Sequence, residues 1–203
     1  MKLVVFGAAG RTGRLIVERA LGHGHAVTAF VHNKSLELEH PALARTTGDV
    51  RDFEAVSSAI EGHTGVAFAL SGAGNLESGI ANVIHAMAEH DVRRVAAVSA
   101  AGTFARNDRA LSLGYRTLIA TTQRPVYDDL ENMELRLMAS DLDWTIVRPF
   151  GLADAPASGH YRLSLDGSLL PKAARISRGD VAAVVLKALE TDTYRRCAVV
   201  IAQ

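Results

Sequence analysis

Residues 3–13 read LVVFGAAGRTG, and the amphipathic segment Leu15–Leu21 follows almost directly. The apolar residues predict a buried strand, Gly7, Gly10 and Gly13 predict a tight turn, and the amphipathic segment predicts a helix. In such an arrangement the glycines let the backbone approach a diphosphate, and the helix N-terminus offers it unpaired N–H groups and partial positive charge. The spacing G-x-x-G-x-x-G between strand and helix therefore predicts a dinucleotide site, against the alternative of a tight turn that merely needs small residues.

The composition limits the class of protein. A chain of 203 residues fits one α/β domain and leaves little room for a separate substrate domain. The 22 basic and 22 acidic residues cancel and aromatic residues make up only 5%, so we expect no nucleic-acid partner and no membrane partner. Because the glycine turn comes so early, we expect no signal peptide. The single cysteine, Cys197, excludes an internal disulfide and favours a cytoplasmic location.

Strand-like and helical patterns alternate along the chain. We expect strands at Lys2–Phe6, Ala26–Val31, Ala44–Thr47, Gly65–Leu70, Arg94–Ser99 and Trp144–Arg148, and helices at Thr12–Gly22, Phe53–Ile60, Gly79–His90 and Val126–Ser140. Several of the strands are continuous apolar runs, as in parallel strands that are covered on both faces. The alternation predicts an α/β fold with a doubly wound parallel sheet, the Rossmann fold.

The last part of the chain, about residues 150–203, departs from the regular alternation of strand and helix patterns. Tyr161–Leu165 alternates like a strand, and the spacing of Ser177 and Asp180 resembles a capping box ahead of the helical run Val181–Leu189. Cys197–Ile201 is typical of a final strand. We expect this part to pack beside the cofactor-binding part and to supply substrate contacts, without forming an independent domain.

The segment after the second predicted strand indicates the cofactor. An NAD site usually has an acidic residue here, which accepts hydrogen bonds from the ribose hydroxyls. This chain has His32, Asn33 and Lys34 instead, and these groups favour a 2′-phosphate. NADP(H) is therefore expected rather than NAD(H), with Arg11 as a second cation beside the phosphate. An ordinary solvated loop is the alternative.

The ends of the other strands supply further candidates. Asp49 is expected to accept from the adenine amino group while Val50 packs on the ring. The alternative role of Asp49 is to cap the helix that begins near Phe53, and one carboxylate can serve both purposes. Small residues after the fourth strand allow the backbone to pass close to the nicotinamide ribose. Ser99 ends the fifth strand, where ligands bind in open sheets, and is the candidate catalytic residue. Phe150 is a candidate for stacking on a planar ligand, with ordinary packing as the alternative.

Several segments together resemble the atypical short-chain dehydrogenases that bind NAD(P). They are Phe6–Gly13, Gly48–Val50, Val98–Ala100, Leu142–Pro149 and Ile176–Val181, and Gly159–Gly167 and Leu189–Tyr194 are further similar to the biliverdin-IXβ reductases, also called NADPH-dependent flavin reductases. The resemblance implies a monomeric enzyme that passes hydride from NADPH to a flavin, a biliverdin-like tetrapyrrole or another planar conjugated acceptor. The strand ends and the resemblance together nominate as cofactor contacts Gly7, Ala9, Gly10, Arg11, Thr12, Gly13, His32, Asn33, Lys34, Asp49, Val50, Leu70, Ser71, Gly72, Ser99, Pro149 and Phe150.

The chain departs from that subfamily at three places. Gly151 and Leu130 stand where the relative has histidines, and the segment Ala101–Pro125 is longer than its counterpart. The substrate side is therefore expected to differ in shape, and the resemblance leaves the identity of the acceptor open.

The residues for ordinary alcohol–ketone chemistry are missing. Short-chain dehydrogenases use Tyr-x-x-x-Lys for proton transfer. Here the residue four positions after Tyr115 is Ile119, and the residue four positions after Tyr127 is Glu131. Reduction of a flavin or tetrapyrrole demands less, because the acceptor delocalises charge and water can supply the proton. The alternative function is a non-catalytic sensor of NADP of the NmrA-like type, although the short chain lacks an added interaction domain. No histidine spacing resembles a zinc site, so we expect no metal.

Overall fold

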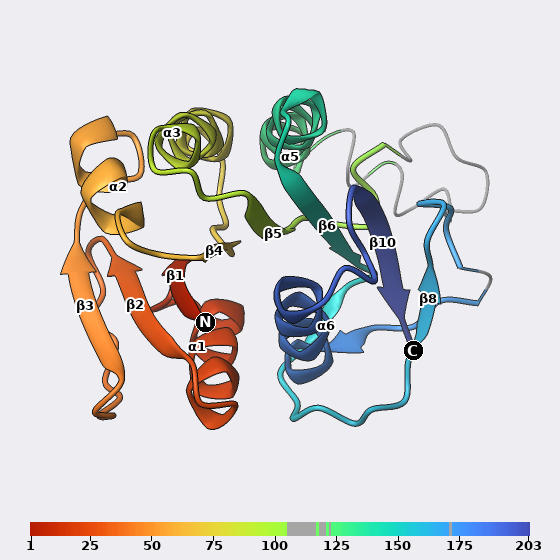
Figure 1. Ribbon diagram of the computed structural model, residues 1–203. Coiled ribbons are helices and arrows are strands. Elements are labelled where there is room, and N and C mark those ends of the chain that lie inside the picture. The colour runs from red at the N-terminus through yellow and green to blue at the C-terminus, as the bar shows by residue number, and fades with distance from the viewer. Residues whose placement is uncertain (105–116, 118–120, 122, 171) are drawn as a thin grey trace.

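The computed structural model describes residues 1–104, 117, 121, 123–170 and 172–203, and its centre is a mostly parallel sheet (Figure 1). The sheet has the strand order β3-β2-β1-β4-β5-β6-β10-β8, and β7 and β9 form a separate parallel pair. Along the chain the elements are β1 Lys2–Phe6, α1 Arg11–Gly22, β2 Ala26–Val31, β3 Leu43–Thr47, α2 Phe53–Ile60, β4 Gly65–Phe68, α3 Leu76–Glu89, β5 Arg94–Val98, α5 Arg124–Ala139, β6 Asp143–Pro149, β7 Leu152–Ala153, β8 Arg162–Ser164, β9 Ile176–Ser177, α6 Arg178–Glu190 and β10 Cys197–Ala202.

The order of the strands confirms the predicted doubly wound fold. The strand β1 pairs in parallel with β2 on one side and with β4 on the other, so the winding reverses direction at β1. Only the edge strand β8 runs antiparallel within the described sheet, against β10. In sheets of this kind ligands bind outside the carboxyl ends of the strands, at the point where the winding reverses.

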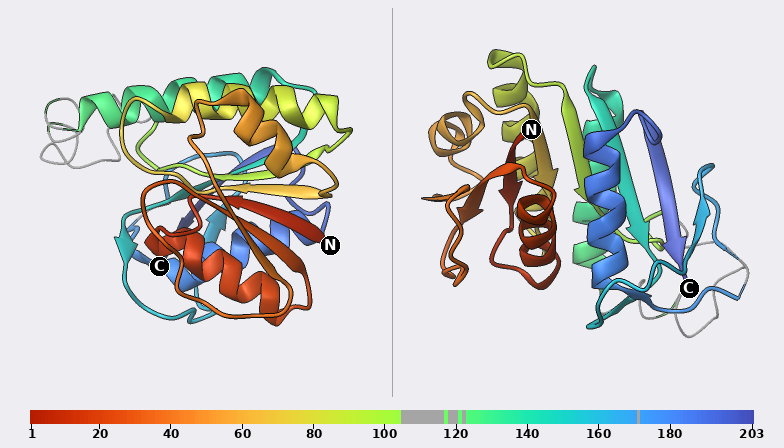
Figure 2. Two further views of the ribbon diagram at one scale, coloured as in Figure 1. Left: turned by 90° about the vertical axis from the view of Figure 1, so that its left-hand side faces the viewer. Right: turned by 60° about the horizontal axis from the view of Figure 1, so that its bottom comes forward.

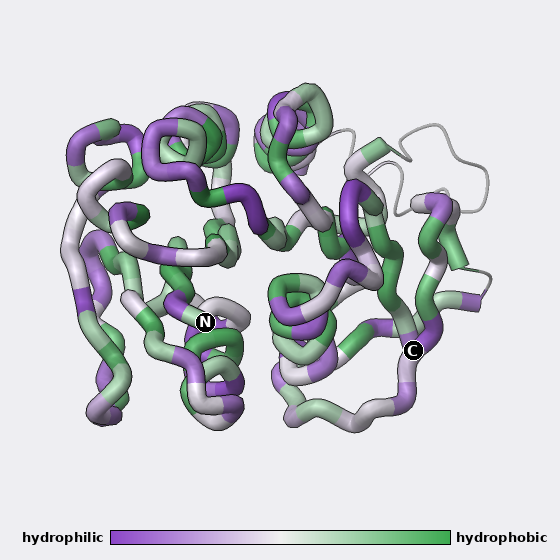
Figure 3. The backbone as a smooth tube through the Cα atoms, in the orientation of Figure 1, coloured by the Kyte–Doolittle hydropathy of each residue, from purple (hydrophilic) through white to green (hydrophobic). Residues whose placement is uncertain are grey.

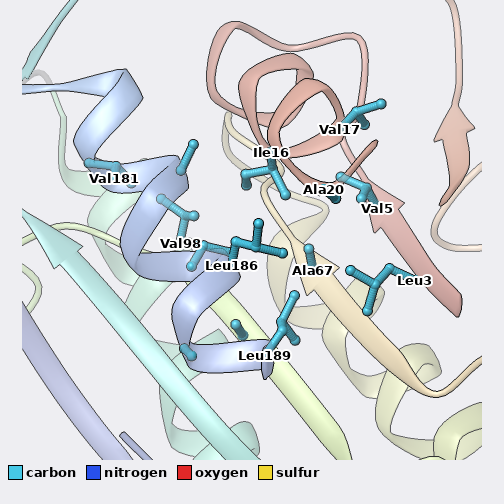
Figure 4. Close-up of a cluster of buried hydrophobic side chains, with 14 of the residues drawn as sticks. Leu3, Val5, Ile16, Val17, Ala20, Ala67, Val98, Val181, Leu186 and Leu189 are labelled. Atoms are coloured by element: carbon cyan, nitrogen blue, oxygen red, sulfur yellow. The ribbon is translucent and has the colours of Figure 1, made fainter. Parts of the chain in front are cut away.

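Helices cover both faces of the sheet. The helices α1 and α6 lie together on one face, and α2, α3 and α5 cover the other (Figures 1 and 2). Alternate residues of β1 therefore enter different cores: Leu3 and Val5 pack towards α1 and α6 (Figure 4), whereas Val4 and Phe6 pack towards the other helices. Burial on both faces explains why the first strand is a continuous apolar run. The helices themselves carry both hydrophobic and hydrophilic residues (Figure 3).

The largest difference from the expected boundaries is at the start of α3. The sequence predicts a helix from Gly79, but α3 begins at Leu76 because a carboxylate from another helix caps it. Asp129 of α5 accepts hydrogen bonds from the backbone N–H groups of Gly74 (2.7 Å), Asn75 (3.2 Å), Leu76 (3.0 Å) and Glu77 (2.9 Å). A cap that comes from another helix leaves no local signal in the sequence.

Ser177 caps α6 as predicted, but the carboxylate of Asp180 binds the Ser177 hydroxyl and a neighbouring loop in place of the Ser177 N–H that a capping box uses. The Ser177 hydroxyl accepts from the N–H of Asp180 at 2.9 Å and donates to its carboxylate at 2.6 Å. The same carboxylate accepts from the backbone N–H groups of Ser158 and Gly159, both at 2.9 Å. Burial opposes the charge, but the hydrogen bonds from Ser177, Gly159 and Ser158 lower the pKa of Asp180 below its usual value. Asp180 therefore holds the loop around residue 158 against the start of α6.

Two smaller points concern the remaining expectations. Cys197 opens β10 as expected, half-buried, with its thiol 3.1 Å from the carbonyl of Leu165. Over the residues that the structure describes, none of the helices combines the length and apolarity needed to cross a membrane. Residues 105–116, 118–120 and 122, which make up most of the lengthened segment and include Tyr115 and Ile119, lie outside the described residues.

Candidate functional site

Two adjoining cavities lie at the carboxyl ends of the central strands. The first, which we term the β2-side groove, has a volume of about 310 Å³ and is lined by Gly7, Ala9, Gly10, Phe30, Val31, His32, Asn33, Lys34, Gly48, Asp49, Val50, Arg51, Ala69, Leu70, Ser71 and Asn75. The second, termed the β5-side pocket, has about 180 Å³ and is lined by Gly10, Arg11, Thr12, Ala69, Leu70, Ser71, Gly72, Leu76, Val98, Ser99, Val126, Leu130, Leu152 and Arg178. They share Gly10 and residues 69–71, so together they form one crevice.

The glycine turn between β1 and α1 forms the floor of this crevice. Gly7 has φ +79°, and a Cβ there would lie 2.5 Å from the carbonyl oxygen of Ala69. A Cβ on Gly13 would lie 2.1 Å from the carbonyl oxygen of Gly7. Among the described residues no side chain caps the start of α1, and its first turn contains no acidic residue. The turn thus leaves backbone N–H groups available to an anion, and it fits the diphosphate of a dinucleotide.

The far end of the β2-side groove is polar and contains cations. His32, Asn33 and Lys34 are exposed after β2, and the Nδ1 atom of His32 lies 3.2 Å from the carbonyl oxygen of Gly48. No carboxylate follows β2 directly, in agreement with the sequence. These groups fit a 2′-phosphate better than an unmodified ribose, because a carboxylate at this place would repel the phosphate.

Arg51 is a part of the groove that the sequence analysis missed. Its Nε atom lies 3.0 Å from Oδ1 of Asp49 and its Nη2 atom lies 2.5 Å from Oδ2, so the guanidinium holds the carboxylate by two bonds. These hydrogen bonds from Arg51 hold the pKa of Asp49 well below its usual range. The alternative role of Asp49 as a helix cap is wrong, because Asp52 caps α2 through the N–H groups of Glu54 and Ala55.

Two residues of α3 and its N-cap shape the middle of the groove. A Cβ on Gly79 would lie 2.8 Å from a methyl group of Val50, so α3 packs closely behind this buried valine. The Oδ1 atom of Asn75 is buried and has no hydrogen-bond partner among the described residues. A buried acceptor without a partner is costly. It fits a groove whose ligand brings hydroxyl groups, as the riboses of a dinucleotide do.

The β5-side pocket contains a buried polar network behind Ser99. The Ser99 hydroxyl donates to Oε1 of Glu134, and the hydroxyl oxygen of Thr103 lies 3.1 Å from the hydroxyl oxygen of Ser99. Arg148 binds the same carboxylate: its Nε atom lies 3.0 and 3.2 Å from the two oxygens, and Nη2 donates as well. Burial raises the pKa of Glu134, and the hydrogen bonds from Arg148, Ser99 and Thr103 oppose the rise. The guanidinium of Arg148 also lies over the ring of Phe104, 5.0 Å from its centre.

Glu134 and Arg148 were not anticipated as site residues, although the sequence holds a signal for one of them. Leu130, Met133, Glu134 and Leu137 fall at helical spacing on the buried face of α5, so an acidic residue interrupts an apolar stripe. A carboxylate on a buried helix face requires a partner. The partner lies on β6, however, and the spacing on α5 does not identify it.

Arg11 does not lie with the cations of the β2-side groove. It lines the β5-side pocket, where its Nη1 atom is 3.0 Å from a carboxylate oxygen of Asp154. Arg178, the first residue of α6, donates to the other oxygen of the same carboxylate at 2.5 Å. The structure therefore places Arg11 beside Arg178, whereas the sequence analysis had grouped it with Lys34.

Three further candidates are absent from the described walls of the crevice. Gly13 lies behind the glycine turn, where it allows α1 to approach. Pro149 is buried in β6 opposite Ile201, and the N–H of Phe150 donates to the carbonyl of Ile201 at 2.9 Å while its side chain packs against the core. The other nominated residues line one of the two cavities.

The sequence analysis expects no metal, but one cluster of potential metal ligands lies near the amino-terminal end of β2, at the opposite end of the strands from the crevice. His23 and His25 lie 2.9 and 2.8 Å from the same carboxylate oxygen of Glu190, and the N-terminal amine of Met1 lies 3.1 Å from Nδ1 of His25. Ligand atoms of the two histidines and the glutamate lie within 4.8 Å of one another. Three ligand atoms this close could hold a metal ion, so the expectation of no metal stays a prediction.

The comparisons with known proteins agree with the geometry. Residues 7–192 match a family described as NAD(P)H-binding. A UPF0659 protein of Schizosaccharomyces pombe is 28% identical over 190 residues, which cover 79% of this chain and 74% of that protein. A short-chain dehydrogenase/reductase of Veillonella parvula, solved in complex with NADP, superposes with a TM-score of 0.86 at 18% identity and covers 100% of this chain and 94% of its own. ChuY, an anaerobillin reductase of Escherichia coli O157:H7, superposes with a TM-score of 0.79 at 21% identity, over 100% and 97% of the two chains.

Proposed function

Because this chain belongs to the NAD(P)H-binding family, we propose that it is an NADPH-dependent reductase of planar conjugated acceptors, such as a flavin or a biliverdin-like tetrapyrrole. One observation carries the proposal: the crevice has cations and no carboxylate after β2 at one end, and an apolar pocket at the other. The resemblance to an NADP complex and to an anaerobillin reductase supports both halves of the proposal.

The residues of the β2-side groove would hold the cofactor. The glycine turn and the start of α1 take the diphosphate, and His32, Asn33 and Lys34 take the 2′-phosphate. Asp49 and Val50 take the adenine, and the free oxygen of Asn75 accepts from a ribose hydroxyl. Leu70 and Ser71 line both cavities and Gly72 lines the β5-side pocket beside them, so these three residues would flank the nicotinamide end. Once bound, NADPH supplies the hydride.

The β5-side pocket would hold the acceptor. Leu76, Val98, Val126, Leu130 and Leu152 give it apolar walls, which suit a flat conjugated ring. Neither tyrosine nor lysine is found among its described lining residues, so the proton for the reduced acceptor comes from water in this scheme. The main task of the protein is then to hold the two rings at reacting distance.

The C-terminal part belongs to the acceptor side in this proposal. Leu152 and Arg178 bring residues 150–203 to the wall of the pocket, and β10 continues the central sheet. We therefore propose that this part is a substrate-side extension and not an independent domain. A monomeric state and a cytoplasmic location stay predictions.

The direct test combines binding and turnover. Calorimetry with NADPH and NADH should show a heat of binding for both and tighter binding of NADPH. Absorbance at 340 nm should then fall when FMN, biliverdin or a quinone is added with NADPH. Absence of binding by either nucleotide would refute the proposal as a whole.

The second candidate is the non-catalytic NADP sensor. The observation that favours it is the lack of a tyrosine–lysine pair on the described walls of the crevice. Strong discrimination between NADP⁺ and NADPH in calorimetry, together with no oxidation of NADPH above the protein-free blank for any acceptor, would support the sensor and reject the reductase.

A further inference from the structure

The Ser99 hydroxyl carries one hydrogen, and the structure directs it away from the β5-side pocket. Its oxygen donates to Glu134 behind the pocket wall. The neighbouring Thr103 hydroxyl lies 3.1 Å from Ser99 and is 2.8 Å from the carbonyl oxygen of Ala100, to which it donates. A hydroxyl that has given away its only hydrogen offers lone pairs alone. Ser99, which lines the pocket, therefore offers it an acceptor.

The ion pair with Arg148 favours the ionised carboxylate of Glu134, which can only accept hydrogen bonds. Its side chain is 0% exposed and that of Arg148 is 9% exposed, and two guanidinium nitrogens bind the carboxylate. A planar guanidinium that holds a carboxylate by two bonds fixes its orientation as well as its charge. Arg148 of β6 thus fixes the carboxylate of Glu134, and one oxygen of that carboxylate accepts the hydrogen bond from Ser99, the residue after β5.

We propose that Glu134 is a positioning residue, which takes the hydrogen of Ser99 and so makes Ser99 an acceptor for an N–H group of the bound ligand. This inference rests on the proposed reductase function. The N–H group belongs to the nicotinamide carboxamide or to the acceptor ring, since flavins and tetrapyrroles both carry N–H groups. A ligand that presents only carbonyl oxygens, such as a quinone, finds no donor at this position.

The polarity of Ser99 depends on the charge of Glu134. When Glu134 takes up a proton, its O–H donates to Ser99, and the Ser99 hydrogen becomes free to point into the pocket. Burial raises the pKa of Glu134, so this change occurs at a higher pH than for an ordinary glutamate. Among the described residues the charged group that faces Glu134 is Arg148, and the charge of Arg148 also acts on the thiol of Cys197 on β10.

The test compares ligands with and without the N–H group. One pair is NADPH and its 3-acetylpyridine analogue, in which a methyl group replaces the carboxamide nitrogen. The other pair is lumiflavin and N3-methyl lumiflavin. At pH 8 we expect the wild-type protein to prefer the N–H member of one pair by about three- to tenfold in Kd or KM, the usual worth of one uncharged hydrogen bond. The pair that shows the preference identifies the donor.

Variants then assign the preference to the two residues. Ser99→Ala should abolish it while leaving the pair of Glu134 and Arg148 intact. In Glu134→Gln the amide oxygen accepts from Arg148, which turns the amide N–H₂ towards Ser99 and frees the Ser99 hydrogen, so the preference should reverse. Ser57→Ala, the same change on α2, where the hydroxyl contacts Glu89 and His90 and not the β5-side pocket, should retain it. In the wild type the preference should also shrink as the pH falls through the raised pKa of Glu134, and Ser99→Ala should show no such trend.

Binding of NADPH separates this inference from the proposed function. If NADPH binds and is oxidised but the wild type treats both pairs alike at pH 8, the inference is overturned and the reductase stands. The same conclusion follows if Ser99→Ala keeps the wild-type preference. The pH series on the wild type needs no variant, so the inference is decided even if Glu134→Gln does not fold.

Discussion

The two halves of the crevice differ in how they are built. The β2-side groove comes from short contiguous segments, the glycine turn at residues 7–13, residues 32–34 and residues 48–51, with polar groups open to solvent. The β5-side pocket depends on Ser99, Glu134 and Arg148, which come from three elements and meet in the interior. The first half is specified by local sequence, and the second exists only once β5, α5 and β6 are packed together.

The largest loss of stability should come from breaking the buried ion pair of Glu134 and Arg148 behind the β5-side pocket. Arg148→Met leaves the buried Glu134 carboxylate without the guanidinium that neutralises it, which costs about 3–5 kcal/mol of the free energy of unfolding. Urea unfolding at pH 7 measures this loss. Because the lone carboxyl group then folds best when protonated, the loss should be smaller at pH 5.

The double variant Glu134→Leu with Arg148→Met is the matched control. It removes both charges and should recover most of the stability, since apolar residues often replace a buried ion pair without loss. Equal stability of Arg148→Met and the wild type would mean that the pair does not hold the pocket together.

The β2-side groove should be most sensitive to a change at Gly13, in the glycine turn. Gly13→Ala places a methyl group 2.1 Å from the carbonyl oxygen of Gly7, so α1 must shift away from β1. We expect a loss of about 1–3 kcal/mol in the free energy of unfolding and weaker binding of NADPH, measured by urea unfolding and calorimetry. Gly22→Ala, in the last turn of the same helix with no atom within 4 Å of the new methyl group, should be neutral or stabilising by up to about 1 kcal/mol. A similar response of both glycines would contradict the close packing of the turn.

Predictability from the sequence follows the same division. The apolar run before Gly7 and the alternation of elements predicted the sheet, and the segment after β2 predicted which polar residues line the groove. Arg11 was placed at the wrong end of the crevice, because a motif gives the path of the backbone but not the direction of a long side chain. The start of α3 was placed three residues late, because its cap is Asp129 on α5. Glu134 and Arg148 lie 14 residues apart and meet through β6, a contact that periodicity does not encode.

The cap on α3 joins the two halves, and its removal should have a smaller effect. Asp129→Ala leaves the N–H groups of residues 74–77 without their carboxylate, at a cost of about 1–2 kcal/mol in the free energy of unfolding. Because Asn75 lines the β2-side groove, NADPH binding should weaken as well. Asp141→Ala serves as the control, because it removes the same charge from an exposed position after α5 and should cost about 0.5 kcal/mol or less. Equal effects of the two variants on melting and on binding would reject the capping role.

The smallest expected effect concerns the choice between the two cofactors. Lys34 is exposed at the open end of the β2-side groove, so its attraction for a 2′-phosphate is weakened by water and salt. Lys34→Glu should raise the Kd for NADPH about fivefold relative to that for NADH, measured by calorimetry at low ionic strength. Lys2→Glu makes the same change in net charge at the start of β1, away from the crevice, and should leave the ratio unchanged. A ratio that shifts equally in both variants would show that net charge alone, and no contact from Lys34, reads the phosphate. A ratio that shifts in neither would move the recognition to the remaining basic residues of the groove, His32 and Arg51.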